Sequence, residues 1–176
     1  MKGEVMDSRG NGMSIRKFEI ERFSVRSSRP FETVVAALKA RVGRLDLVEL
    51  EKMSKPATSF SELEKLIVRD LGTTGLMLFM ELDQGAVLRK ESGLDKPKIV
   101  RFLIGNPLIM KEMVKNLPDA GSYAPVTVLI DDRDDGVHLS YDKMVSLLAP
   151  YGNAKASAVA RDLDIKVENL LCESAV

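Results

Sequence analysis

Apolar and polar residues alternate with a period of two through much of the middle of the chain. This pattern is typical of half-buried strands, because successive side chains point to opposite faces of a sheet. Glycine, proline and aspartate separate the alternating segments, which favours antiparallel hairpins. The predicted strands span residues 17–25, 76–82, 87–90, 98–104, 126–130 and 136–141.

Apolar residues at helical spacing predict helices on either side of these strands. Ser28 and Pro30 provide a cap and a first-turn proline for the first helix. Ser61, with Glu64 three residues later, has the spacing of a capping box. The predicted helices span residues 31–42, 61–71, 107–117, 142–149 and 156–171, whereas residues 44–60 fit either strand or helix.

Strands grouped in the middle of the chain, with helices grouped outside them, predict an α+β fold. We expect a mainly antiparallel sheet with helices packed on one face, and a parallel βαβ sheet is the weaker alternative. A length of 176 residues suits one compact domain. We assign residues 16–176 to that domain and residues 1–15, which are polar and contain three glycines, to a flexible N-terminal arm.

Composition narrows the classes of partner. Lys and Arg number 26 and Asp and Glu number 26, so the net charge is zero and the attraction that underlies non-specific nucleic-acid binding is missing. No apolar run approaches the roughly 18 residues of a membrane helix. The single cysteine, Cys172, cannot form an intramolecular disulfide. We therefore expect a soluble cytoplasmic protein that binds neither nucleic acid nor membrane.

The residues offer little recognisable catalytic chemistry. His138 alternates with apolar neighbours, which is typical of a histidine on the polar face of a strand. The acidic segment at residues 131–136 resembles a calcium loop, but Arg133 occupies a ligand position, so a hairpin turn is favoured. Nine methionines are expected mainly in the core, although methionines can also line an adaptable pocket. We expect no metal and no cofactor.

Gly105, Asn106 and Pro107 predict a helix that starts at the proline. Proline has no amide hydrogen to lose there, and the asparagine side chain can accept from the free amides of the first turn. A cap of this kind would be preserved by the substitution Asn106→Asp. A functional interpretation adds that the helix N-terminus attracts anions and that Gly105 permits close approach to the backbone.

The motif Phe-Leu-Ile-Gly-Asn-Pro at residues 102–107 resembles the signature of the family catalogued as domain of unknown function 302. The proline-led strand at residues 123–130 and the strand at residues 136–142 are similar to that family in the same order. The resemblance covers residues 18–171 and implies a TATA-binding-protein-like α+β fold, often dimeric, with no established activity. Gln84 stands where many members carry a histidine, so no histidine chemistry is transferred.

Two hypotheses of function follow. The first is a non-enzymatic module that binds a small molecule or a protein partner in a groove near the start of the predicted Gly-Asn-Pro helix, with Asp83, Gly105, Asn106 and Tyr141 nearby. The alternative is a small enzyme that uses Asp83 as general base with Tyr141 or His138 as proton donor, which requires these groups within about 3 Å of one substrate atom. Strand alternation already places His138 and Tyr141 on opposite faces.

We also expect a homodimer. Few charges interrupt the strand at residues 126–130, so an open edge there would invite aggregation. A central position in the sheet or pairing between subunits would protect it, and coverage by the C-terminal helix is the alternative.

Overall fold

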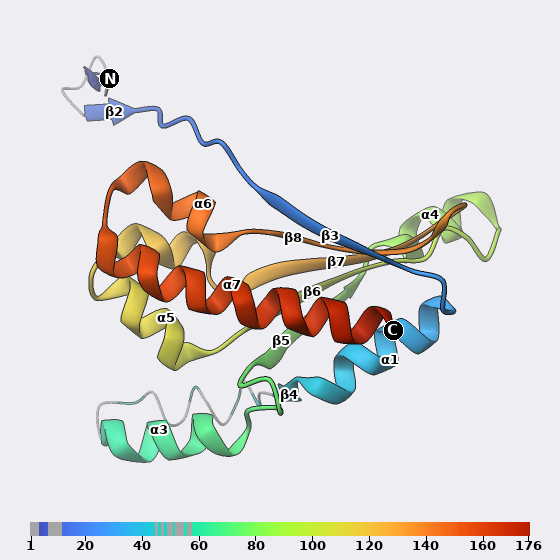
Figure 1. Cartoon of the computed structure of the whole chain (residues 1–176), viewed down its shortest axis with the longest axis horizontal. Helices are drawn as coiled ribbons and strands as arrows, with labels where there is room; N and C mark the ends of the chain where they lie inside the picture. The colour runs from blue at the N-terminus through green and yellow to red at the C-terminus, as the bar shows by residue number, and fades with distance from the viewer. Residues whose placement is uncertain are drawn as a thin grey trace.

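The computed structural model describes residues 4–6, 12–44, 46, 48, 51, 55 and 58–176. Its main feature is a six-stranded sheet in the order β3-β8-β7-β6-β5-β4, antiparallel except for the β4–β5 pair (Figure 1). The sheet strands are β3 (Arg22–Ser27), β4 (Gly43–Arg44), β5 (Met77–Asp83), β6 (Ile99–Gly105), β7 (Val126–Arg133) and β8 (Gly136–Asp142). The predicted α+β class with a mainly antiparallel sheet is confirmed.

Helices connect and cover these strands. They are α1 (Phe31–Arg41), α3 (Phe60–Arg69), α4 (Gly85–Ser92), α5 (Pro107–Val114), α6 (Met144–Leu148) and α7 (Ala154–Ala175), with two short 3-10 helices, η1 (Pro118–Tyr123) and η2 (Ala149–Tyr151). None of the described helices is long and apolar enough to cross a membrane.

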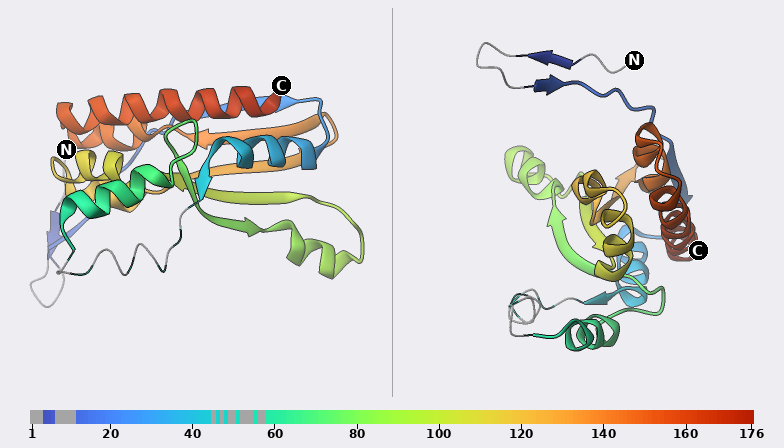
Figure 2. Two further views of the ribbon diagram at one scale, coloured as in Figure 1. Left: turned by 90° about the horizontal axis from the view of Figure 1, so that it is seen from below. Right: turned by 90° about the vertical axis from the view of Figure 1, so that its left-hand side faces the viewer.

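One face of the sheet carries the core. Alternate residues of β6 and β7, among them Phe102, Ile104, Val128 and Ile130, are buried, whereas the residues between them are half-buried. The long helix α7 runs across the buried face beside α1 and α5 (Figures 1 and 2). Helices α1, α5 and α7 therefore pack on one face, and within the described residues the opposite face, which we call the open face, carries no comparable layer of helices.

The strand β7 lies inside the sheet, hydrogen-bonded to β6 and β8 on its two sides. This is the central position predicted for residues 126–130. Pairing between subunits is not needed to protect this strand, so its pattern no longer argues for a homodimer.

Two local predictions agree closely with the structure. The helix α5 begins at Pro107, and the Asn106 side chain accepts from the backbone N–H of Leu108 at 2.8 Å. The acidic segment at residues 131–136 contains the tight β7–β8 turn at Asp134 and Asp135, and Gly136, the first residue of β8, adopts a positive φ of 128°. A Cβ at that position would also lie 2.7 Å from the carbonyl oxygen of Ser27.

The prediction of a strand at residues 87–90 is wrong, because this segment belongs to α4. The two apolar residues of this segment, Val87 and Leu88, are too few to separate a period of two from a helical period. The carboxylate of Asp83 accepts from the backbone N–H of Ala86, which satisfies an amide of the first turn, and Gly93 ends the helix in the left-handed region.

Three element boundaries also differ. The capping box of α3 uses Ser59 and Glu62, two residues earlier than predicted. The N-cap of α1 is Pro30, without a side-chain cap from Ser28. Strand pairing of β3 begins at Arg22 and continues to Ser27, so residues 17–21 of the predicted strand pair with none of the described strands.

Near the N-terminus, β1 (Glu4–Met6) and β2 (Gly12–Ser14) pair with each other and lie away from the main sheet (Figure 1). The sequence predicts a flexible N-terminal arm for residues 1–15. Its division from the domain at residue 15 stays a prediction. Most of residues 45–57 lie outside the described residues.

Candidate functional site

The junction between β6 and α5 holds two of the four predicted site residues. Gly105 is the last residue of β6, and Asn106 follows it as the cap of α5. Both polar atoms of the Asn106 side chain form hydrogen bonds. Its oxygen accepts from the N–H of Leu108, and its Nδ2 donates to the carbonyl oxygen of Gly75 at 3.0 Å. Asn106 thus fixes the start of α5 and ties it to the segment before β5.

A pocket of about 150 Å³ opens beside this junction, and we name it the GNP pocket. Its wall is almost entirely apolar, and none of the described residues that line it carries a titratable side chain. The lining residues are Phe79, Gly105, Asn106, Pro107, Ile109, Met110, Met113, Ala124, Pro125, Val126 and Leu163.

Gly105 faces this pocket. A Cβ added there would lie 3.5 Å from the Phe79 ring and 3.5 Å from Cβ of Pro125, which are ordinary contacts. The missing side chain leaves room in the pocket, and no backbone contact requires glycine. This arrangement can hold a small apolar group, but it offers no acid, base or nucleophile for catalysis.

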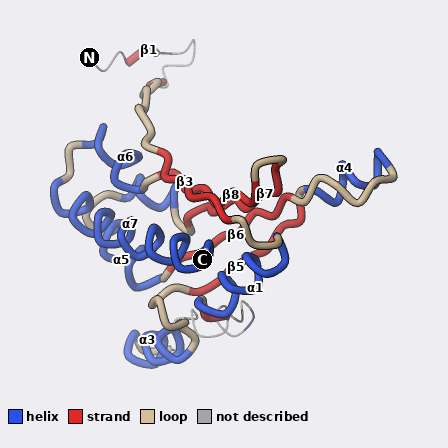
Figure 3. The backbone as a smooth tube through the Cα atoms, turned by 45° about the vertical axis from the view of Figure 1, so that its right-hand side comes forward, coloured by secondary structure: helices blue, strands red, loops and turns tan. Residues whose placement is uncertain are grey.

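Asp83 lies at the other end of the sheet. In the β5–β6 ladder, Asp83 is opposite Val100, whereas Gly105 is opposite Met77. Five to six residues of strand therefore separate Asp83 from Gly105, a distance of about 18 Å. Figure 3 shows α4, which follows Asp83, and α5 at opposite ends of the sheet.

The carboxylate of Asp83 already has partners. It forms an ion pair of 2.7 Å with Arg89 and accepts from the backbone N–H of Ala86. The hydrogen bond from Arg89 lowers the pKa of Asp83 below its ordinary value. A carboxylate stabilised in its charged form is a poor general base, so its contacts favour a structural role at the start of α4.

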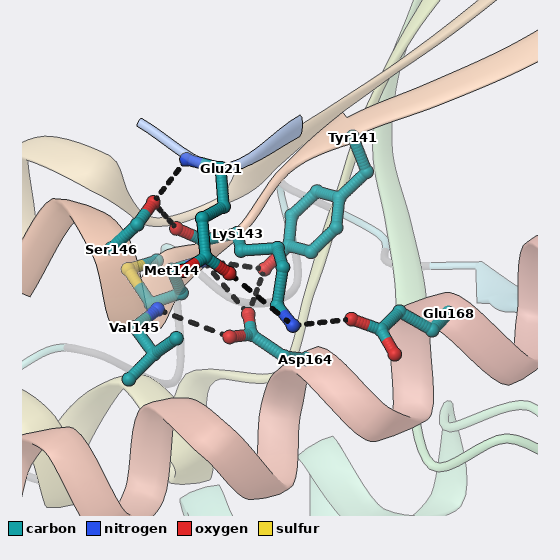
Figure 4. A network of polar contacts seen from close by, with 8 residues as sticks. All are labelled: Glu21, Tyr141, Lys143, Met144, Val145, Ser146, Asp164 and Glu168. Carbon is teal, nitrogen blue, oxygen red and sulfur yellow. Dashed lines mark hydrogen bonds and ion pairs between the residues drawn. The ribbon is translucent and has the colours of Figure 1, made fainter. Parts of the chain in front are cut away.

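The side chain of Tyr141 is buried in the core, although the residue also lines a hollow on the opposite face of the sheet. Its hydroxyl donates to the carboxylate of Asp164 in α7 at 2.6 Å, and the residue is 2% exposed (Figure 4). Burial and the negative charge of Asp164 raise the pKa of Tyr141 above its ordinary value. The hydroxyl is therefore a weak proton donor that no open surface reaches.

Asp164 organises a buried polar network. Besides Tyr141, it accepts from the backbone N–H groups of Met144 at 2.8 Å and Val145 at 3.1 Å. These are amides of the first turn of α6, so a residue of α7 caps a helix that has no side-chain cap of its own. Lys143 joins the network through an ion pair of 3.1 Å with Glu168 (Figure 4).

The structure brings Gly105 and Asn106 together and separates Asp83 and Tyr141 from them and from each other. Asp83 lies on β5 and Tyr141 on β8, with β6 and β7 between them. Three strand spacings correspond to about 14 Å. The two side chains cannot contact one substrate atom, which removes the geometry that the enzymatic hypothesis requires of the Asp83–Tyr141 pair.

His138 and Cys172 do not form a site either. The His138 ring is hydrogen-bonded to Asp135 at 2.8 Å in the β7–β8 hairpin, and Cys172 is exposed. Within the described residues, no group of three or more histidine, cysteine, aspartate or glutamate side chains could hold a metal ion.

Sequence reasoning missed most of the GNP pocket and every member of the Asp164 network except Tyr141. Met110 and Met113 were expected mainly as core residues, and only the adaptability of methionine pointed towards a pocket. Asp164 directly follows Leu163 on the buried side of α7, so an acidic residue within an apolar helical face was the available signal. Phe79 and Pro125 carry no comparable signal.

Comparisons with known proteins agree on one family. The model of the family described as "Domain of unknown function DUF302" matches residues 50–173. The chain is similar to the crystal structure of an uncharacterized conserved protein DUF302 from Bacillus stearothermophilus, with a TM-score of 0.60 and 14% identity over 87% of this chain and 97% of that one. At this identity the likeness shows the fold alone. No curated protein matches the chain.

Proposed function

The chain belongs to the DUF302 family, and from that premise we propose that it is a non-enzymatic module that binds a small apolar ligand in the GNP pocket. The observation that carries the proposal is the lining of the pocket, which is apolar and contains no titratable side chain. Small-molecule sites are typically concave and largely apolar. The half-buried Asn106, Ile109 and Met110 at its wall leave a route from the surface.

The volume limits the size of the ligand. Dry apolar cavities of about 150 Å³ hold a molecule such as benzene. A ligand of roughly six non-hydrogen atoms, at a ceiling of about −1.5 kcal/mol per atom, binds with about micromolar affinity or more weakly. The ligand is therefore a small aromatic or aliphatic molecule, or the apolar end of a larger one.

The test is a titration with benzene monitored by methyl-group NMR on the full chain. We expect saturable shifts at Met110, Met113 and Leu163, which line the pocket. Gly105→Ala should weaken binding, since its methyl group enters the pocket without a clash. Gly121→Ala is the matched control, because its methyl group would meet only Val114, at 3.7 Å, outside the pocket. Unchanged methyl shifts in the wild type, or equal binding by both variants, would exclude the proposal.

We further propose a cytoplasmic homodimer without a nucleic-acid partner. Support for the dimer comes from Phe60 and Val68 of α3, large apolar residues that are 51% and 55% exposed. The free Cys172 suits a reducing compartment, and zero net charge gives little attraction to nucleic acid. Light scattering at micromolar concentration should give twice the chain mass, and a monomer would contradict the dimer.

A further inference from the structure

The open face of the sheet carries an arginine without a counter-ion. Arg101 lies on β6 between the buried Val100 and Phe102, so its side chain points to the face opposite the helices. Within the described part of the chain, no carboxylate forms an ion pair with Arg101. This contrasts with Arg22 and Arg26 of β3, which pair with Asp142 and Asp135.

The hydrogen-bonding capacity of this guanidinium is largely unused. It has five N–H donors, and one of them binds the hydroxyl of Thr127 at 2.9 Å. Its Nε is buried and has no hydrogen-bond partner among the residues that the structure describes. A partly desolvated cation with unfilled donors is costly in the free protein, and an oxyanion is the ligand that would offset this cost.

Two hollows flank this side chain. The first hollow has a volume of about 210 Å³, and its lining includes Gln84, Leu129 and Ser140. The second has a volume of about 230 Å³, and its lining includes Ser122 and Tyr123. Arg101, Thr127 and Asp142 line both of them.

Further polar groups in the first hollow lack partners. The side-chain amide of Gln84 and the hydroxyl of Ser140 form no hydrogen bond with any residue that the structure describes. Ser140 lies in the same cross-strand row as Arg101, with Leu129 between them. Both groups can donate to a ligand that occupies this hollow.

The local charge favours an anion. Asp142 is the one carboxylate that lines these two hollows, and it is bound by Arg22 through two hydrogen bonds of 2.6 and 2.8 Å. The Arg22–Asp142 pair is neutral as a unit, so the positive charge of Arg101 is not compensated by Asp142. The hollows therefore combine a net positive charge with neutral donors.

We propose that Arg101, together with Ser140 and Gln84, forms a binding site for the oxyanion of a small molecule on the open face of the sheet. The oxyanion is a carboxylate or a phosphate, which have the same hydrogen-bonding requirement for an arginine. The apolar surface of Leu129 lies beside it for the remainder of the ligand. This site is separate from the GNP pocket and stands independently of it.

The experiment titrates the full chain with sodium acetate and, in a second arm, with inorganic phosphate, at constant ionic strength set by sodium chloride. Amide NMR should show saturable shifts at Arg101, Thr127 and Ser140. Binding of acetate alone identifies an organic acid, binding of phosphate alone identifies a phosphate ester, and binding of both supports the shared chemistry. Absence of saturable shifts at these residues with either anion overturns the proposal, and this result needs no variant.

Arg101→Gln should weaken anion binding about tenfold or more, since it removes the charge-assisted hydrogen bonds. Arg26→Gln is the matched control: it removes a positive charge from the same face, outside both hollows, and should change the affinity less than twofold. Equal weakening by the two variants would reveal a general charge effect and refute the site. Gly105→Ala should leave anion binding unchanged and Arg101→Gln should leave benzene binding unchanged, so the two proposals fail separately.

Discussion

The substitution Asp164→Asn tests whether the buried network holds α6 and α7 together. Every hydrogen-bonded partner of the carboxylate is a donor: the Tyr141 hydroxyl at 2.6 Å, the Met144 N–H at 2.8 Å and the Val145 N–H at 3.1 Å. An asparagine has one acceptor oxygen, and its NH2 group is itself a donor. If the oxygen keeps Tyr141 and Met144, the NH2 group must face the N–H of Val145.

The expected loss follows from these contacts. One hydrogen bond to a charged group is lost, about 1.5–3 kcal/mol, and a buried donor is left unsatisfied, about 1–3 kcal/mol. Part of this loss is offset, because burial raises the pKa of Asp164 and its charge is costly in the core. We expect Asp164→Asn to lower the free energy of unfolding by about 2–4 kcal/mol.

The assay is urea unfolding followed by circular dichroism, with Asp162→Asn as the control. Asp162 lies on the same helix and is exposed, so its substitution should change stability by less than about 0.5 kcal/mol. Tyr141→Phe should cost about 1–2 kcal/mol, and the double variant should lose less than the sum because the two residues share a hydrogen bond. A loss below about 0.5 kcal/mol for Asp164→Asn, or strict additivity in the double variant, would refute this account of the network.

The remaining predictions concern single local contacts. The cap alone predicts that Asn106→Asp is neutral. In the structure, however, the side-chain N–H of Asn106 donates to the carbonyl oxygen of Gly75, and the substitution replaces this donor by an oxygen, so Asn106→Asp should lower the free energy of unfolding by about 1–3 kcal/mol. An unchanged midpoint in urea unfolding would contradict this prediction. Gly43→Ala should cost about 3 kcal/mol or more, since its Cβ would lie 1.8 Å from the carbonyl oxygen of Asp70, and a stably folded variant with wild-type melting temperature would refute the close approach. Asp83→Asn should lower stability by no more than about 1 kcal/mol at pH 7, because the Asp83 side chain is 47% exposed and solvent screens its ion pair with Arg89. The Asp83 pKa is lower when folded, so its contribution is present above about pH 3.9 and is lost as the pH falls through the folded pKa; a wild-type advantage that persists in thermal melts at pH 2 would exclude the ion pair as its source.

The sequence alone determined the features that depend on neighbouring residues. The start of α5 at Pro107 follows from the fixed φ of proline and the reach of the Asn106 side chain, both of which act within one turn. The strands β6, β7 and β8 follow from alternation long enough to display a period of two. Their grouping was sufficient for the fold class, because an apolar face of a sheet must be covered by another layer.

Tertiary structure decided which residues share a site. Asp83 and Gly105 belong to paired strands, and only the register of that pairing shows that they lie at opposite ends. The GNP pocket joins β6, α5, β7 and Leu163 of α7, which are distant in sequence. The helical pattern predicts only which side of α7 Asp164 lies on. The backbone amides that its carboxylate caps belong to α6, a separate segment of the chain, so this role could not be predicted from the pattern. Local pattern thus fixes conformation over a few residues, and the approach of segments far apart in sequence depends on packing of the whole core.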